Sequence, residues 1–167
     1  AKRIPSLRWA PCLLLSGLSS LRFSLRFHQR AIISSLEARL YHFCYNIAMK
    51  VVIQRVKSAK VTREEDKKVV GEIKQGLFIL LGIKKGDTEK EVDELVNKIV
   101  KLRIMSDEAE KMNLSIQEVK QEILLVSQFT LYANTKDGNR PSFIDAEEPT
   151  KAKELYEYMI KKLKESQ

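Results

Sequence analysis

The chain has 167 residues with 30 Lys and Arg against 22 Asp and Glu, which gives a formal charge of +8. An apolar share of 44% and a charged share of 31% are typical of a globular domain and unlike a disordered chain. Two cysteines and two histidines exclude a disulfide framework and most zinc sites, and no run of apolar residues is long enough to predict a membrane-spanning helix.

Residues 1–48 differ in chemistry from the rest of the chain. They hold seven basic residues and one acid, with both cysteines, both histidines and the only tryptophan. An Arg-, Ser- and Leu-rich stretch nearly free of acids is typical of an organelle transit peptide, whereas a start at Ala and a clean strand pattern from Met49 favour translated upstream sequence. On either interpretation we exclude residues 1–48 from the fold and assign residues 49–167, with a net charge of +2, to one domain.

Strands are predicted over the first third of this domain. Residues 49–56 (MKVVIQRV) form a β-branched run, and residues 58–62 continue its alternation. A charged turn at 64–68 leads to a third short strand over 69–73. Residues 77–83 (LFILLGI) are apolar throughout, which predicts a strand buried on both faces.

Two helices and one more strand complete the pattern. Thr88 and Glu91 form a capping box that opens an amphipathic helix ending near Arg103. Residues 106–118 are polar and predicted to be irregular, and residues 122–131 (EILLVSQFTL) are predicted to be a central strand. After a loop, Pro149 begins a second amphipathic helix. The fold class is α/β, a mixed sheet covered by two helices on one side.

The available chemistry is narrow, because no His or Cys occurs from Met49 onward. Nucleophilic pairs with a histidine and thiolate chemistry are therefore excluded from the domain. Ser127, Gln128 and Thr130 directly follow an apolar strand, and α/β proteins bind ligands outside the carboxyl ends of strands. The alternative is a half-exposed structural strand.

Two further candidates are weaker on their own. In residues 136–143 (KDGNRPSF), Arg140 offers a fork for phosphate and Phe143 a stacking face, although a plain surface loop has the same composition. Arg55 lies inside the first strand, where an arginine is usually an exposed-face residue.

Three segments occur together in order: 49–56, 76–88 (GLFILLGIKKGDT) and 124–143 (LLVSQFTLYANTKDGNRPSF). Over residues 49–167 the chain strongly resembles the D-aminoacyl-tRNA deacylases, also called D-tyrosyl-tRNA deacylases. The resemblance implies a homodimer of barrel-like mixed α/β protomers. It implies hydrolysis of the ester that joins a D-amino acid or glycine to the terminal adenosine of tRNA, without metal or organic cofactor and without a membrane. It places the protein in the cytoplasm, or in a mitochondrion or plastid if residues 1–48 are a transit peptide.

The resemblance also implies roles for individual residues. Phe129 and Thr130 lie at the position that stabilises the oxyanion. Thr130 is a candidate nucleophile, but without a neighbouring base we favour assistance by the substrate's own 2′-hydroxyl. Substrate binding falls to Ser127, Gln128, Arg55, Arg140, Pro141, Ser142 and Phe143.

One departure from the family is serious. Members carry a Gly–cis-Pro dipeptide on a late strand, which reaches into the partner's site and excludes L-amino acids, but no Gly-Pro occurs in this sequence. Arg55, which helps to hold that dipeptide in the family, lacks this partner here. We therefore expect a C-terminally truncated chain that is a poor enzyme and a poor dimer. The alternatives are a non-catalytic nucleic-acid-associated relative and an inactive fragment.

Overall fold

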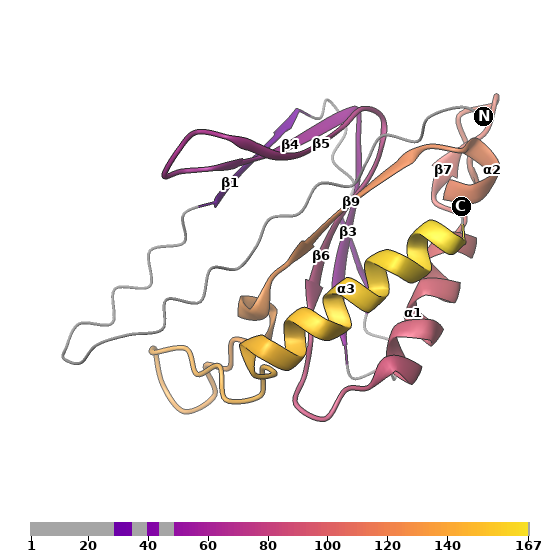
Figure 1. Cartoon of the computed structure of the whole chain (residues 1–167). Coiled ribbons are helices and arrows are strands. Elements are labelled where there is room, and N and C mark those ends of the chain that lie inside the picture. The colour runs from indigo at the N-terminus through magenta and orange to yellow at the C-terminus, as the bar shows by residue number, and fades with distance from the viewer. Residues whose placement is uncertain (1–28, 35–39, 44–48, 167) are drawn as a thin grey trace.

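A four-stranded sheet forms the centre of the molecule in the computed structural model, which describes residues 29–34, 40–43 and 49–166. Its strand order is β2 (Leu40–Phe43), β3 (Lys50–Val56), β6 (Gly76–Gly82) and β9 (Glu122–Ser127) (Figure 1). β6 and β9 run parallel, and the other neighbours are antiparallel. The predicted strands over 49–56 and 77–83 are confirmed.

A three-stranded sheet continues from the first. It contains β1 (Gln29–Ser34), β4 (Ser58–Arg63) and β5 (Val69–Ile73) in the order β1–β4–β5. β3 passes into β4 through Lys57 alone. A small apolar cluster joins this sheet to one face of the central sheet; it contains Val56, Ala59, Val61, Val70, Ile73, Phe78 and Leu124.

Two long helices cover the other face of the central sheet (Figure 1). They are α1 (Glu89–Lys101) and α3 (Pro149–Glu165), as the sequence predicts. The Thr88 side chain accepts from the Lys90 N–H, and the Glu91 carboxylate accepts from the Thr88 N–H at 2.8 Å, which is the predicted capping box. Tyr156 of α3 donates to the Leu125 carbonyl oxygen at 2.8 Å and so ties this helix to β9.

β6 is buried on both faces because the two clusters meet at it. Leu77, Ile79 and Leu81 are fully buried in the larger cluster beneath the helices. Phe78 points into the smaller cluster on the opposite face. Each such side chain contributes roughly 1.5–3 kcal/mol on burial, so β6 is the strand that holds the domain together.

The sequence-based expectation of an irregular segment over 106–118 is wrong. β7 (Met105–Ser106) pairs with β8 (Met112–Leu114), and a one-turn helix α2 (Ile116–Val119) follows. Ser115 begins this turn with a second capping box, in which the Ser115 N–H donates to the Glu118 carboxylate at 2.6 Å. Buried Ile116 anchors it.

The sheet is mixed, but no sheet among the described residues closes on itself, so the barrel-like description is not seen. Two strands that the sequence did not predict, β1 and β2, come from residues before Met49 and pair at sheet edges. The assignment of residues 1–48 to an extension outside the domain stays a prediction, and residues 1–28 lie outside the described part.

Candidate active site

The candidate site begins where β9 ends. The Gln128 N–H makes the last contact with β6, donating to the Leu81 carbonyl oxygen at 2.7 Å. The chain then turns into the 3₁₀ helix η1 (Phe129–Tyr132), so the predicted strand over 122–131 is four residues too long. The turn packs onto Gly82, where a Cβ would lie 3.0 Å from the Tyr132 ring and 3.1 Å from the Leu131 Cβ. Because Gly82 of β6 has no side chain, Leu131 and Tyr132 have room to fold back against this strand.

The Thr130 N–H in this turn has no hydrogen-bond partner among the described residues. Leu131 N–H donates to the Gln128 carbonyl oxygen at 3.3 Å, and Ala133 N–H donates to that of Thr130 at 3.0 Å. No hydrogen bond between described residues uses the N–H of Thr130. The Gln128 side-chain amide donates to the Thr130 hydroxyl, and no His, Lys or carboxylate among the described residues bonds to that hydroxyl. The geometry therefore offers a backbone donor and lacks a base for a threonine nucleophile.

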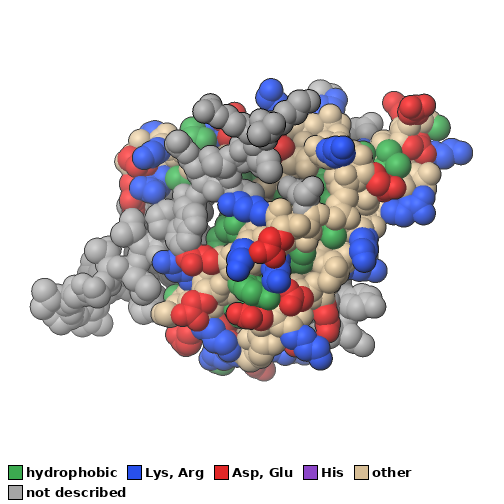
Figure 2. Space-filling view, turned by 45° about the vertical axis from the view of Figure 1, so that its right-hand side comes forward, with side chains coloured by type: hydrophobic (Ala, Val, Ile, Leu, Met, Phe, Trp, Pro, Cys, Tyr) green, Lys and Arg blue, Asp and Glu red, His purple; other side chains and the backbone are tan. Residues whose placement is uncertain are grey.

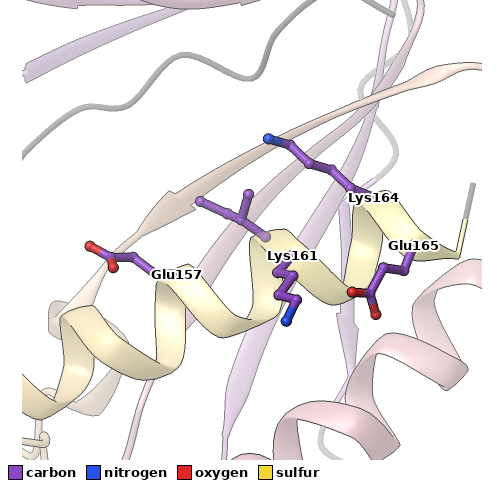
Figure 3. Close-up of a pocket in the computed structure, with 5 residues that line it drawn as sticks. Glu157, Lys161, Lys164 and Glu165 are labelled. Carbon is purple, nitrogen blue, oxygen red and sulfur yellow. The ribbon is translucent and has the colours of Figure 1, made fainter.

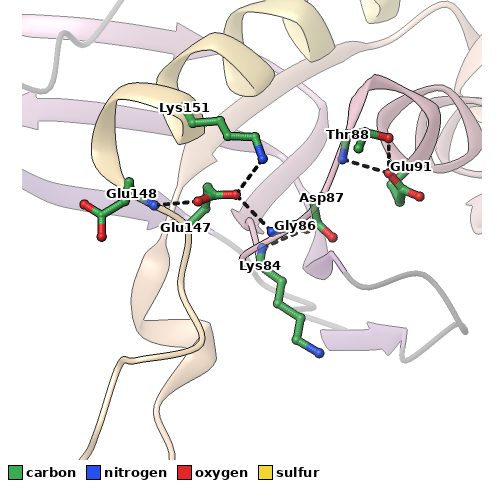
Figure 4. Close-up of polar contacts among 8 residues, drawn as sticks. All are labelled: Lys84, Gly86, Asp87, Thr88, Glu91, Glu147, Glu148 and Lys151. Atoms are coloured by element: carbon green, nitrogen blue, oxygen red, sulfur yellow. Dashed lines mark hydrogen bonds and ion pairs between the residues drawn. The ribbon is translucent and has the colours of Figure 1, made fainter.

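A distant segment brings Phe143 to this turn. Residues 145–147 run beside the end of β6, where Lys85 N–H donates to the Asp145 carbonyl oxygen and Glu147 N–H to that of Ile83, both at 3.0 Å. The Glu147 carboxylate then accepts from the Gly86 N–H at 3.1 Å and pairs with Lys151 at 3.0 Å (Figure 4). These contacts lock the segment between Phe143 and α3 against the strand end.

The aromatic rings of Phe129 and Phe143 meet edge to face, with centroids 5.2 Å apart and planes at 76°. Ser142 joins the same neighbourhood, since it exchanges two backbone hydrogen bonds of 2.8 Å with Asn134. The structure therefore brings the 127–130 segment and the Ser142–Phe143 pair together. Arg140 and Pro141 lie on the exposed loop between them.

Arg55 lies elsewhere in the described chain. It pairs with Leu77 on β6, whereas Ser127 pairs with Leu81, four residues further along the strand. At about 3.3 Å per residue this separates the two positions by roughly 13 Å. The Arg55 guanidinium donates to the Ser106 hydroxyl at 2.8 Å. Its role in substrate binding stays a prediction that nothing within one described chain tests.

Sequence reasoning missed the buried polar groups behind the turn. Asp87 is 1% exposed; one carboxylate oxygen accepts from the Lys84 N–H at 2.7 Å, and the other has no partner among the described residues. Burial raises the pKa of Asp87, with further upward contributions from the charges of Glu91 and Glu147. Burial likewise raises the pKa of Tyr132, with the Asp87 charge adding to it. An Asp before a helix N-cap carries no sequence signal of burial.

Other surfaces offer less chemistry. A surface pocket is lined by Glu157, Ile160, Lys161, Lys164 and Glu165 of a single helix (Figure 3). The pocket lies over the C-terminal half of α3, away from η1 (Figure 1). At this end of α3 the Gln117 side chain of α2 donates to the Ser166 carbonyl oxygen. Figure 2 shows acidic and basic side chains interspersed over the visible face. Within the described residues there is no group of three or more His, Cys, Asp or Glu suited to a metal, and no helix long and apolar enough to cross a membrane.

Known proteins are similar to this chain in sequence. A family model described as D-Tyr-tRNA(Tyr) deacylase matches residues 52–167. The D-aminoacyl-tRNA deacylase of Aquifex aeolicus (strain VF5) is 58% identical over 118 residues, covering 71% of this chain and 78% of that protein. The D-aminoacyl-tRNA deacylase of Clostridium tetani (strain Massachusetts / E88) is 57% identical over 117 residues, covering 70% of this chain and 77% of that protein.

Two solved structures are similar in fold. One, named "c-Myc DNA Unwinding Element Binding Protein", has a TM-score of 0.64 and 37% identity and covers 70% of this chain and 76% of its own. The other, named "Structural Analysis of a probable eukaryotic D-amino acid tRNA deacylase", has a TM-score of 0.61 at 16% identity and covers 70% and 67%. The mixed α/β fold is thus shared with solved structures, and the sequence matches a known class of enzymes. The chain belongs to the D-Tyr-tRNA deacylase family.

Proposed function

We propose that this protein hydrolyses the ester bond of D-aminoacyl-tRNA, releasing free D-amino acid and tRNA. Family membership supports the reaction class. One observation places the reaction at the end of β9: residues 127–130 and 140–143 meet there through the contact between the Phe129 and Phe143 rings. The Thr130 N–H, which has no partner among the described residues, belongs to the same turn. The substrate is the 3′-terminal adenosine bearing a D-amino acid, such as D-Tyr, or a mischarged glycine.

The proposed chemistry needs little from side chains because an aminoacyl ester is already activated. Water adds to the ester carbonyl carbon, and the developing oxyanion accepts a hydrogen bond from the Thr130 N–H. A donor of this kind is typically worth about 3–4 kcal/mol in the transition state. The ester C–O bond then breaks, and the ribose oxygen leaves with a proton. The adjacent 2′-hydroxyl of the substrate assists, in place of a protein base. No metal or organic cofactor takes part in this proposal.

Binding falls to groups around this donor. The two phenyl rings form an apolar wall for the adenine, while Ser127 and Gln128 hydrogen-bond the adenosine and Ser142 lines the same neighbourhood. Exposed Arg140, next to Pro141, is suited to a tRNA phosphate. Arg55 acts in a homodimer, toward the partner. The reaction is assigned to the cytoplasm, or to an organelle if residues 1–48 direct import.

Thr130 variants test the catalytic assignment. Thr130→Ala keeps its backbone N–H, so it should retain most of the hydrolysis of D-Tyr-tRNA. A D-Tyr-tRNA linked at the 3′ position and lacking the terminal 2′-hydroxyl should be nearly inert. Rates on both substrates, measured with the 167-residue chain and with the product of the complete transcript, decide between the two mechanisms. A folded Thr130→Ala protein that is as inactive as a nucleophile mutant would instead assign attack to the hydroxyl.

A second candidate is nucleic-acid binding without catalysis, favoured by the likeness, at 37% identity, to a solved structure named as a DNA unwinding element binding protein. The two candidates differ in what they require of the strand-end turn. Binding alone would persist in a protein that leaves D-Tyr-tRNA intact. Filter binding with tRNA and with single- and double-stranded DNA, run beside the deacylation assay, separates them.

A further inference from the structure

Lys50, the first residue of β3, makes two contacts with the end of η1. Its ammonium group donates to the Leu131 carbonyl oxygen at 3.2 Å and lies 4.6 Å from the centre of the Tyr132 ring. Lys50 therefore holds the two residues that follow Thr130 from the side of the neighbouring strand.

The turn needs such support because its own bonding is sparse. η1 has four residues, and its first internal hydrogen bond, from Leu131 N–H to the Gln128 carbonyl oxygen, is 3.3 Å long. Runs of 3₁₀ helix have poorer hydrogen-bond geometry than α-helices and seldom persist alone. Leu131 and Tyr132 pack directly on the backbone of Gly82, which pairs with Lys50 in the register of β3 and β6. The packing on Gly82 and the contacts with Lys50 together fix the orientation of the peptide groups around Thr130.

The Lys50 contacts differ in kind from packing. A charged donor forms a stronger hydrogen bond with a carbonyl oxygen than a neutral one. A cation above an aromatic face adds attraction when the pair is partly desolvated, and Lys50 is half-buried while Tyr132 is 4% exposed. Both contacts are lost together when the charge is removed.

We propose that Lys50 is a positioning residue for the deacylation: its ammonium group pins the Leu131–Tyr132 end of η1 and thereby aims the Thr130 N–H at the oxyanion. The inference rests on the proposed function. An oxyanion donor acts only at the correct distance, and a displacement of about 1 Å can cost on the order of 100-fold in rate. Loss of the Lys50 charge should therefore lower kcat and leave KM nearly unchanged, since the adenosine-binding rings do not depend on it.

The test compares Lys50→Met with Lys50→Arg and with Lys57→Met. Methionine keeps the length and removes the charge, and arginine restores a charged donor. Lys57 is an exposed lysine just beyond the other end of β3. With D-Tyr-tRNA we expect kcat to fall about 10- to 100-fold for Lys50→Met, a substantial recovery with Lys50→Arg and no change for Lys57→Met. Equal kcat values for the two methionine variants would overturn the inference.

A second measurement reports on the turn without activity. Amide hydrogen exchange in the segment 128–133 should become faster in Lys50→Met than in wild type, and not in Lys57→Met. If wild-type protein hydrolyses D-Tyr-tRNA but the Lys50→Met turn exchanges at the wild-type rate, the positioning role is wrong and the function stands. If the wild-type protein does not hydrolyse D-Tyr-tRNA, the function fails and the inference with it. Should Lys50→Met fail to fold, Lys50→Gln is compared with Lys50→Arg by the same two measurements.

Discussion

At the scale of single residues, close backbone approach decides where β6 and β9 can meet. A Cβ on Gly76 would lie 1.9 Å from the Glu122 carbonyl oxygen and 2.8 Å from its carbon. No side chain can relieve that overlap, because both atoms belong to the backbone of the neighbouring strand. The first register pair of the parallel ladder, Gly76 with Glu122, therefore depends on glycine.

Gly76→Ala should lower the free energy of unfolding by about 2–3 kcal/mol, the upper part of the range for an overpacked core. Gly86→Ala is the comparison: it has open space around it but a left-handed φ of 91°, so its cost should be about 1 kcal/mol. Urea denaturation of both variants measures the difference. A Gly76→Ala protein as stable as wild type would mean that the two strands separate more easily than their pairing indicates.

Asp87 makes stability depend on pH in an unusual direction. Burial raises the pKa of this carboxyl in the folded state above its ordinary value of 3.8, so the folded protein keeps the proton to higher pH than the unfolded chain. The contribution of this group to stability is therefore full below about pH 3.8 and declines as pH rises toward the folded pKa. Asp87→Asn removes that decline.

The stability of Asp87→Asn relative to wild type should accordingly rise between about pH 4 and pH 7, as denaturant titrations at several pH values would show. Asparagine can still accept from the Lys84 N–H, so the turn before α1 is kept. Asp137→Asn, on the exposed loop, serves as the control and should show no such trend. A relative stability of Asp87→Asn that falls with pH would contradict the assignment.

At the scale of elements, Glu147 couples the end of β6 to the start of α3 and so positions Phe143 (Figure 4). Its carboxylate also accepts from the Glu148 N–H at 3.0 Å, and this bond is the main cause of its lowered pKa. A lowered folded-state pKa means that the stabilisation is present above the ordinary value of 4.5 and is lost as pH falls through the folded pKa.

Glu147→Gln should cost about 1–2 kcal/mol at neutral pH, because the ion pair with Lys151 and the charge-assisted hydrogen bonds are weakened together. The deficit should shrink as pH falls below 4.5. Glu148→Gln, one residue along and exposed, should be close to wild type. Thermal melts of both variants across this pH range check the prediction, and equal stabilities at neutral pH would refute it.

The elements that local pattern could predict are those with strong periodicity. The β-branched run of β3, the apolar run of β6 and the capping box of α1 each carry their structure in neighbouring residues. β9 ends earlier than its pattern indicates, because the apolar Leu131 and Tyr132 continue the alternation and only Gly82, on another strand, makes room for the turn. The burial of Asp87 and the Lys50 contacts likewise depend on distant residues. Ser127, Gln128, Thr130, Arg140 and Phe143 could be picked out as candidates from the sequence alone, but only the family resemblance assigned roles to them.

At the scale of the whole molecule, the two described clusters that hold the domain are built on strands β3 to β6, β9 and the helices. β1 and β2 pair at edges of the two sheets. An edge strand contributes less than a central one because only one of its sides is paired. The described part is therefore arranged so that the domain from Met49 onward contains its own core.

A protein that starts at Met49 should fold and keep most of the thermal stability of the whole chain. Melting curves of the two proteins, followed by circular dichroism, compare them directly. A small decrease reflects the loss of the β1 and β2 edges. A decrease of many degrees would show that residues 1–48 belong to the domain.

The central claim is that the strand-end site hydrolyses D-aminoacyl-tRNA. The most direct test is the ratio of single-turnover hydrolysis rates for D-Tyr-tRNA and L-Tyr-tRNA, measured with protein from the complete transcript. We expect rapid release of D-Tyr and an L-Tyr-tRNA rate close to that of the substrate alone. Equal acceleration of both substrates would contradict stereochemical selection, and no acceleration of either would contradict the proposed function.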